Sequence, residues 1–158
     1  MRSSVLMQWL RSLFALALAC LSFLATSCTS AKVSQCKNLL EIAARSNPQA
    51  PADRAPKSEQ MIRQADLAEQ KAEQVESVGI TDAKLKEYQS SIANLYKEES
   101  QRFQDAAKAQ IAANQVSAKT DKASLDALSK SASLYLKAIE IYSQQNDAIG
   151  NLSAYCTQ

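Results

Sequence analysis

The four cysteines, Cys20, Cys28, Cys36 and Cys156, are the residues of this 158-residue chain whose type and spacing indicate chemistry. The chain contains no histidine, which excludes Ser-His-Asp and Cys-His catalysis and the ordinary zinc and haem sites. The sequence also lacks Gly-rich phosphate loops, EF-hand loops and Gly-x-Ser-x-Gly elbows. We therefore predict no enzyme activity, no cofactor and no metal site, and the thiols remain to be explained.

The first 27 residues have the order of a secretory signal. Arg2 and Arg11 supply positive charge, and the apolar stretch 12–24 is short for a transmembrane span, which needs about 20 apolar residues. Small and hydroxyl residues follow at 25–27. This order predicts export. It divides the chain into a signal peptide (1–27), a short tether (28–32) and a folded domain (33–158).

Cys28 directly follows the run Leu24-Ala25-Thr26-Ser27, which resembles the lipobox of bacterial lipoproteins. In that family the cysteine is lipidated and becomes the first mature residue. The resemblance implies a lipid anchor on Cys28 and a location on the periplasmic or lumenal side of a bacterial membrane. Two alternatives stay open. One is an ordinary signal peptide cut near Ala25 or Ser27, and the other is lipidation at Cys20, after a very short apolar stretch.

Cys36 and Cys156 remain once the signal and the anchor are set aside. Two thiols allow one pairing, and export permits disulfides. We therefore predict a Cys36–Cys156 disulfide, with two buried free thiols or two attachment sites for an external partner as the alternatives. A cross-link that closes a loop of about 100 residues removes denatured-state entropy equivalent to roughly 4.7 kcal/mol, as an upper figure.

Helix breakers are few and lie close together. The three prolines fall within 48–56, and the two glycines are Gly79 and Gly150. Ala, Gln, Lys, Glu, Ser and Leu dominate elsewhere, and this composition favours helix. The sequence predicts helices at about 33–45, 57–77, 82–115 and 120–146, joined by a proline loop and short turns, with 147–158 as a packed tail.

These elements predict an all-α fold, an antiparallel up-down-up-down bundle of three long helices and a short N-terminal helix. Short connections make neighbouring helices antiparallel. This topology brings Cys36 and Cys156 to the same end of the bundle, so one disulfide joins the two ends of the folded chain. The third helix is longer than the second, and its apolar stripe is interrupted at 98–102. We expect fraying, a bend or an overhang there.

The apolar spacing identifies the seams that should face the core. The second helix has Met61, Ala65, Ala68, Ala72 and Val75, and the fourth has Leu125, Leu128, Ala132, Tyr135, Ile139 and Tyr142. Further apolar residues widen the face of the fourth helix, which we predict to be the most buried. Gly79 should end the second helix as a left-handed cap, and Thr81 and Asp82 should begin the third.

Two polar groups and the tyrosines have alternative interpretations. The carboxylates Asp66, Glu69, Glu73 and Glu76 share a helix face and could bind a cation, but the interleaved Arg63 and Lys71 favour a solvated face. Glu98 and Glu99 likewise favour a solvated patch over a contact site. The five tyrosines favour an amphipathic core. A pocket for a pigment or aromatic ligand is the alternative.

Removal of Arg2 and Arg11 leaves equal numbers of basic and acidic residues, so nucleic-acid binding has no electrostatic support. A polybasic patch is also missing, so membrane association would rest on the lipid. The signal, a cysteine near each end of the mature chain and the segment Ile80–Gln89 (ITDAKLKEYQ) resemble small secreted helical proteins of unknown function in cyanobacteria. Lipoprotein subunits of cyanobacterial photosystem II are similar in size and four-helix form, which is an architectural likeness.

We therefore predict a membrane-tethered interaction or accessory module that joins a larger membrane protein assembly. The alternative is a carrier that holds a small apolar ligand or pigment between its helices. Because Cys28 and Cys36 are close in sequence, the disulfide end should lie near the membrane and the proline loop should point away from it. Surface loops often carry recognition, and this predicts partner contacts at Gln49, Asp53 and Arg54.

Overall fold

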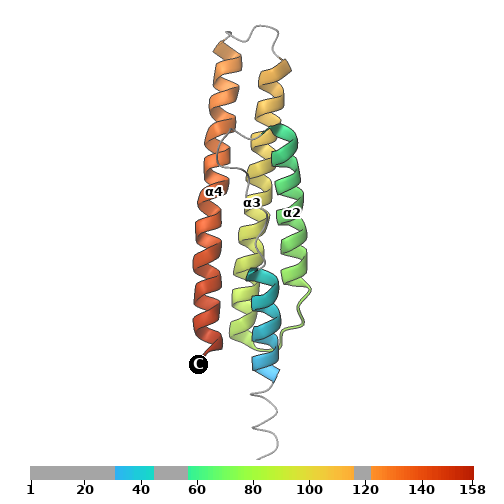
Figure 1. The fold of residues 1–158 in the computed structure, drawn as a ribbon, viewed down its shortest axis with the longest axis vertical. Helices are drawn as coiled ribbons and strands as arrows, with labels where there is room; N and C mark the ends of the chain where they lie inside the picture. Colours follow the sequence, from blue (N-terminus) through green and yellow to red (C-terminus); the bar gives the residue numbers. More distant parts are fainter. Residues whose placement is uncertain (1–30, 45–56, 116–121) are drawn as a thin grey trace, which may run out of the picture.

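The computed structural model describes residues 31–44, 57–115 and 122–158, and these form an elongated helical bundle (Figure 1). Within the described residues there are four helices and no strand. They are the N-terminal helical segment 31–44 (the N-terminal segment below), α2 (Ser58–Glu76), α3 (Ala83–Gln115) and α4 (Lys122–Cys156). The predicted all-α fold is confirmed, as expected for segments that are rich in good helix formers.

Successive helices run in opposite directions along one axis (Figure 1). The long helix α3 packs against both α2 and α4. The disulfide Cys36–Cys156 joins the N-terminal segment to the last residue of α4, with 5.7 Å between the two Cα atoms. Both the up-down-up-down topology and the predicted disulfide are therefore confirmed. We call this end of the bundle the disulfide end and the opposite one the far end.

Hydrogen bonds lock the turn between α2 and α3 to the disulfide end. Gln35 Oε1 accepts a hydrogen bond from the Thr81 amide (3.0 Å), and Gln35 Nε2 donates to Thr81 Oγ1 (2.8 Å). Asp82 Oδ1 accepts from the amide of Leu85 at 2.8 Å, which confirms the predicted cap of α3. Tyr155 at the end of α4 donates its hydroxyl to the same carboxylate (3.2 Å). Three helices thus meet at one polar junction.

Side chains from α2 and α3 fix the other end of the described N-terminal segment. The Nζ atom of the buried Lys71 donates to the carbonyl oxygen of Ile42 at 2.9 Å. Tyr96 donates its hydroxyl to the carbonyl oxygen of Ala43 at 3.0 Å. Carbonyls near the C-terminal end of a helix need partners outside it, and a positive charge there is favourable. The N-terminal segment is therefore held at both ends.

The predicted left-handed cap at Gly79 is wrong, because no glycine in the described part of the chain has a positive φ. The helix α2 ends through Ser77, which keeps right-handed dihedral angles of −71° and −13°. The side-chain amide of Gln89 donates to the carbonyl oxygens of Val75 and Val78, each at 2.8 Å. The neighbouring helix α3 thus donates to the carbonyl oxygens at the end of α2, which a glycine cap would otherwise have satisfied.

The helix α3 is continuous through the polar interruption at 98–102. Arg102 pairs with Glu98 at 3.1 Å, and Gln101 donates to Asp105 at 2.9 Å. Both are i, i+4 pairs, which stabilise a helix on its solvent face. Of the outcomes expected for this helix, the overhang is the observed one, because α3 extends beyond the start of α2 toward the far end (Figure 1).

The predicted end of the fourth helix near residue 146 is wrong, because α4 continues through Gly150 to Cys156. Leu152 is fully buried, and Ile149 packs against the same core cluster. A glycine inside a helix costs about 1 kcal/mol relative to alanine, less than a buried leucine side chain contributes, at about 1.5–3 kcal/mol. The expected packed tail is therefore the last part of the helix.

The seam of α2 is confirmed, but the prediction that α4 is the most buried helix is wrong. All five predicted seam residues of α2 are buried. In α4 five of the six buried residues recur every seven residues, and Ile141 is the sixth. None of the six belongs to the predicted seam: Ser124, Ser131, Ala138, Ile141, Gln145 and Leu152. Four large apolar residues of the same helix are exposed by 42–64%: Leu125, Leu128, Leu136 and Ile139.

Hydrogen bonds between α4 and α3 explain this choice of seam. Ser131 Oγ donates to the carbonyl oxygen of Ala106 (2.9 Å), and Ser124 Oγ donates to that of Ala113 (3.2 Å). A serine hydroxyl reaches the backbone of a neighbouring helix only when the two helices lie close together. Small residues at the contact permit this approach, and the larger apolar side chains of α4 are then left outside it.

Candidate functional site

The residues predicted to carry the anchor and the partner contacts lie outside the described residues. They are Cys28, Gln49, Asp53 and Arg54. The lipid anchor and the contacts of the proline loop therefore stay predictions. Cys36 and Cys156 are described and paired.

The four carboxylates on α2 are exposed, as expected for a solvated helix face. Glu76 Oε1 pairs with Nζ of Lys97 on α3 at 2.7 Å. Among the described residues, no group of three or more acidic, cysteine or histidine side chains is arranged to hold a metal ion. The geometry of α2 therefore offers a surface ion pair with α3 and no convergent site.

The tyrosines pack at contacts between helices. The rings of Tyr88 and Tyr155 lie 5.6 Å apart, and those of Phe103 and Tyr135 lie 5.9 Å apart. Tyr96 is buried, and its burial, together with the nearby Glu99 carboxylate, raises the pKa of its hydroxyl to about 12. These contacts are those of an amphipathic core, in which the tyrosine rings fill the space between helices.

A buried carboxyl group lies at mid-length of the bundle, where a solvated patch was predicted. Glu98 is exposed, but Glu99 is only 5% exposed, so the prediction is wrong for Glu99. Its Oε2 atom accepts a hydrogen bond from Nε2 of the buried Gln145 at 2.7 Å. Burial raises the pKa of this carboxyl, and the hydrogen bond from Gln145 opposes that shift. Its position on the apolar stripe, between Tyr96 and Phe103, is the sequence signal for this burial.

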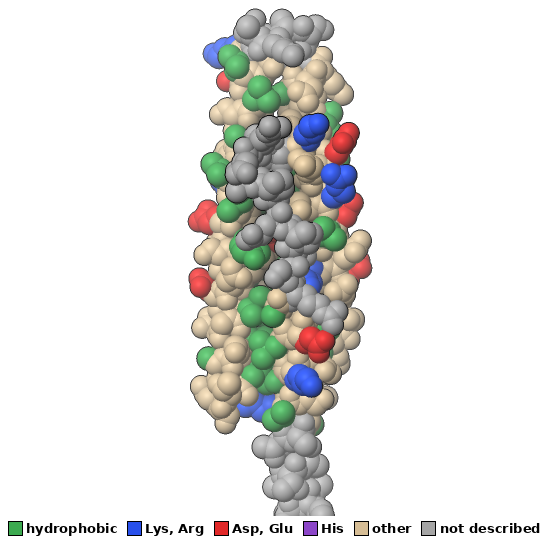
Figure 2. All heavy atoms as spheres, viewed as in Figure 1, with side chains coloured by type: hydrophobic (Ala, Val, Ile, Leu, Met, Phe, Trp, Pro, Cys, Tyr) green, Lys and Arg blue, Asp and Glu red, His purple; other side chains and the backbone are tan. Residues whose placement is uncertain are grey.

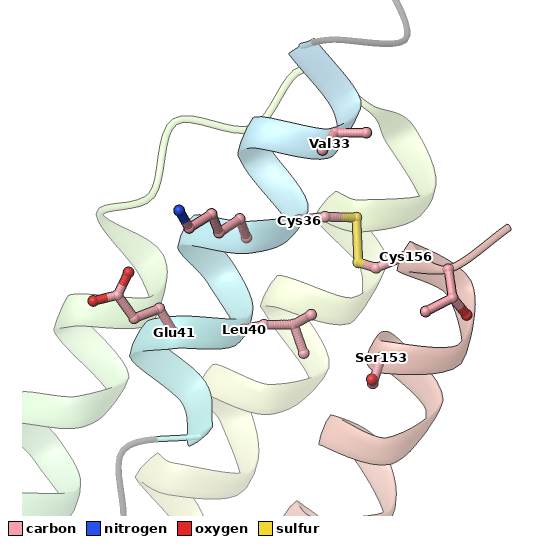
Figure 3. A pocket seen from close by; sticks show the side chains of 8 residues that line it. Val33, Cys36, Leu40, Glu41, Ser153 and Cys156 are labelled. Carbon is pink, nitrogen blue, oxygen red and sulfur yellow. A yellow bond between two sulfur atoms is a disulfide. The ribbon is translucent and has the colours of Figure 1, made fainter.

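A mostly apolar hollow of about 650 Å³ lies beside the disulfide, between the N-terminal segment and the end of α4 (Figure 3). In Figure 3, Leu40 points from the N-terminal segment toward α4, and Ser153 lies on the opposite wall. The hollow is open to solvent and has room for an apolar group. Its lining residues are Val33, Cys36, Lys37, Leu40, Glu41, Ser153, Cys156 and Thr157.

The second surface feature is a row of apolar residues on α4 that we call the α4 stripe. Its members lie three or four residues apart and therefore share one side of the helix: Leu125, Leu128, Ala132, Leu136 and Ile139. Figure 2 shows apolar side chains at the surface along this part of the bundle. The sequence interpretation assigned most of these residues to the core.

The position of the α4 stripe along the bundle follows from the pairing of α4 with α3. Ser131, at the middle of the stripe, lies opposite Ala106. Tyr96, which contacts the described end of the N-terminal segment, is ten residues nearer the disulfide end of α3. The stripe is therefore in the far half of the bundle, beyond the level reached by residues 31–44.

Comparison of the chain with models of protein families, with curated proteins and with solved structures found no match. Among the described residues, no helix has the length and apolar character needed to cross a membrane.

Proposed function

We propose that this protein is an exported, membrane-tethered interaction or accessory module that presents helix α4 to a larger membrane protein assembly. The observation that carries this proposal is the α4 stripe, whose four large side chains are 42–64% exposed on one side of one helix. Contiguous apolar surface of this kind marks interaction sites on soluble domains. The lipobox-like run before Cys28 supports the tether.

The bundle separates the proposed anchor from the proposed docking surface. The chain leaves the N-terminal segment toward Cys28 near the disulfide, whereas the stripe is centred on Ala132 of α4. At 1.5 Å per residue, Ala132 is about 36 Å along the helix from Cys156. A rigid rod with a tether at one end would hold the stripe clear of the lipid headgroups and within reach of a protein that projects from the membrane.

The test uses a photoreactive residue introduced singly at Leu136, at Gln49 in the proline loop, and at Gln144 as an exposed control on α4. Each variant is expressed as the full chain, crosslinked in native membranes and analysed by mass spectrometry. We expect protein crosslinks from Leu136 and none from Gln144. Crosslinks from Gln49 would add the loop to the contact surface. Equal yields at Leu136 and Gln144, or none at Leu136, would contradict the docking role of α4.

The tether is tested separately by Cys28→Ser. The variant should fold and be exported but leave the membrane fraction after a high-salt wash, because no polybasic patch is present to hold it. A Cys28→Ser protein that still sediments with membranes would contradict the lipid assignment.

The second candidate function is that of a carrier for a small apolar ligand, and the hollow beside Leu40 and Cys36 favours it. Native mass spectrometry of the protein purified from membranes should then show a bound lipid or pigment in stoichiometric amount. Leu40→Gln should abolish its retention, and the exposed Lys37→Gln at the edge of the hollow should retain it. A ligand-free mass for the unaltered protein would contradict the carrier.

A further inference from the structure

The residues of the α4 stripe are arranged symmetrically about Ala132. Leu125 and Ile139 are each seven residues from it, and Leu128 and Leu136 are each four residues from it. All four large side chains are exposed, and the central residue is small. The stripe therefore presents the same order of side chains when it is read in either direction along the helix.

A surface with this symmetry is complementary to itself under a two-fold rotation. Two copies that face each other with antiparallel α4 helices place Leu125 opposite Ile139 of the second copy, and Leu128 opposite Leu136. Ala132 faces its own equivalent on the axis, where its small side chain permits close approach of the helices. From this arrangement we propose that the stripe is occupied by a second copy of this chain. Such an isologous contact is the commonest form of self-association.

Charged residues at the two ends of the stripe specify the antiparallel direction. Lys122 and Glu140 are 18 residues, or about five helical turns, apart and so lie on the same side of α4, where both are exposed. Antiparallel pairing brings Lys122 of each copy close to Glu140 of the other. Parallel pairing would place these flanks of the two copies on opposite sides of the contact, so neither Lys122 would meet a Glu140.

The size of the contact indicates a weak, concentration-dependent dimer. The stripe spans about 21 Å of helix, and a single helix face of this length buries less than the roughly 800 Å² per partner that is typical of stable complexes. The inference rests on the part of the proposed function that makes the α4 stripe a docking surface, and it names the occupant of that surface.

Engineered cysteines in the full exported chain test the pairing. Ala132→Cys places a thiol on the two-fold axis and should give an intermolecular disulfide under mild oxidation, because the two Cα atoms can come within the roughly 7 Å that the bond allows. Leu125→Cys alone should give at least about tenfold less dimer, since antiparallel pairing puts its equivalent about 21 Å away. Leu125→Cys combined with Ile139→Cys should restore the cross-link.

The unaltered chain is the control for dimers that form through its own thiols. Cross-linking of Ala132→Cys and Leu125→Cys with equal yield would overturn the antiparallel pairing. An absence of cross-linked dimer at Ala132, with crosslinks from Leu136 to a different protein, would overturn self-pairing and leave the proposed function standing. No crosslink to any protein from the stripe would overturn both.

Charge reversal gives an independent measurement by analytical ultracentrifugation of the detergent-solubilised protein. Lys122→Glu should weaken dimerisation about fivefold to tenfold, because each copy contributes one reversed contact of a size typical of surface ion pairs. Lys122→Glu combined with Glu140→Lys should restore the original affinity. If the double variant dimerises no better than the single one, the antiparallel contact is wrong.

Discussion

The two halves of the bundle use apolar side chains in opposite ways. At the disulfide end the core contains large, fully buried residues, among them Leu39, Leu85 and Leu152. Toward the far end the buried positions of α4 against α3 include Ser124, Ser131 and Ala138, while Leu125, Leu128 and Leu136 of α4 are exposed. Large apolar side chains from all four helices therefore meet in the core of one half, and small side chains of α4 line its contact with α3 in the other.

The difference follows from how closely the helices approach. Where the N-terminal segment contributes a fourth helix, large side chains fill the space between all four. Where α3 and α4 pair through Ser131 and Ala106, the hydrogen bond to the backbone and the small side chains bring the helices together. Closely approaching helices leave little room for leucine between them, and the excess apolar residues become surface. The exposed apolar α4 stripe in the far half is thus a direct result of tight packing beneath it.

Loss of the disulfide, which closes one half of the bundle, should have the largest effect on stability. Cys36→Ser with Cys156→Ser removes a bond between residues 120 positions apart. We expect the free energy of unfolding to fall by about 2–5 kcal/mol, because the cross-link mainly restricts the denatured chain. Chemical denaturation measures the loss, and far-UV circular dichroism should show largely unchanged helicity at low temperature. An unaltered unfolding free energy would contradict the prediction.

The same substitution at the two ends of α4 tests the comparison directly. Leu152→Ala should lower the free energy of unfolding by about 2–5 kcal/mol, because Leu152 is fully buried. Leu125→Ala should change it by less than about 0.5 kcal/mol, because Leu125 is 54% exposed. Thermal and urea denaturation of the two variants, measured at low protein concentration, provide the comparison. Similar losses at both positions would show that the far half is packed like the disulfide end.

Enlarging a small contact residue should separate α3 from α4. Ser131→Leu inserts a larger side chain against the backbone of Ala106 and removes a 2.9 Å hydrogen bond. We expect a loss of about 1–3 kcal/mol from overpacking. Ser129→Leu, on the exposed side of the same helix, is the matched control and should be nearly neutral. If Ser131→Leu is as stable as Ser129→Leu, the close approach of the helices is not required.

The smallest effect concerns Glu99, whose burial raises the pKa of its carboxyl above the ordinary value of 4.5. A raised pKa in the folded state means that the associated stability is fully present below the ordinary pKa and is lost as the pH rises through the raised value. Glu99→Gln should therefore flatten the decline of stability with pH above 4.5 and raise stability at pH 7. Denaturation curves across this range measure it, with the exposed Glu98→Gln as control. A steeper decline in Glu99→Gln would reverse the sign and contradict the assignment.

The sequence was sufficient to predict the elements and their order. The prolines indicated the start of α2, and Gly79 indicated the end of α2 and the start of α3. Counting the thiols of a chain predicted to be exported led to the Cys36–Cys156 pair. The predictions failed where a distant side chain decided the outcome. The side chain of Gln89 donates to carbonyl oxygens at the end of α2, where a glycine cap was predicted. The side chain of Gln145 donates to the buried carboxylate of Glu99. Neither hydrogen bond has a local signal in the sequence, although the position of Glu99 between Tyr96 and Phe103 does indicate its burial.

The seam of α4 shows a different limit. The sequence of this helix is apolar on more than one side, so periodicity alone allowed several seams. The largest residues were assigned to the core because burial of leucine stabilises more than burial of serine. The structure selects Ser124 and Ser131, whose hydroxyls donate to the carbonyl oxygens of Ala113 and Ala106 on the partner helix. Which residues of α4 face the core therefore depends on the sequences of both α3 and α4, and the periodicity of α4 alone does not predict it.

If Cys28 carries the proposed lipid, the disulfide also determines how a mechanical load would pass through the protein. A pull applied at the α4 stripe travels along the hydrogen-bonded helix to Cys156, crosses a covalent bond to Cys36 and continues down the chain toward Cys28. This path bypasses every helix–helix contact. Without the bond, the same pull would have to pass through α3 and α2 and their noncovalent interfaces. The bond therefore gives a short covalent path between the α4 stripe, which would contact a partner, and Cys28, which would carry the lipid.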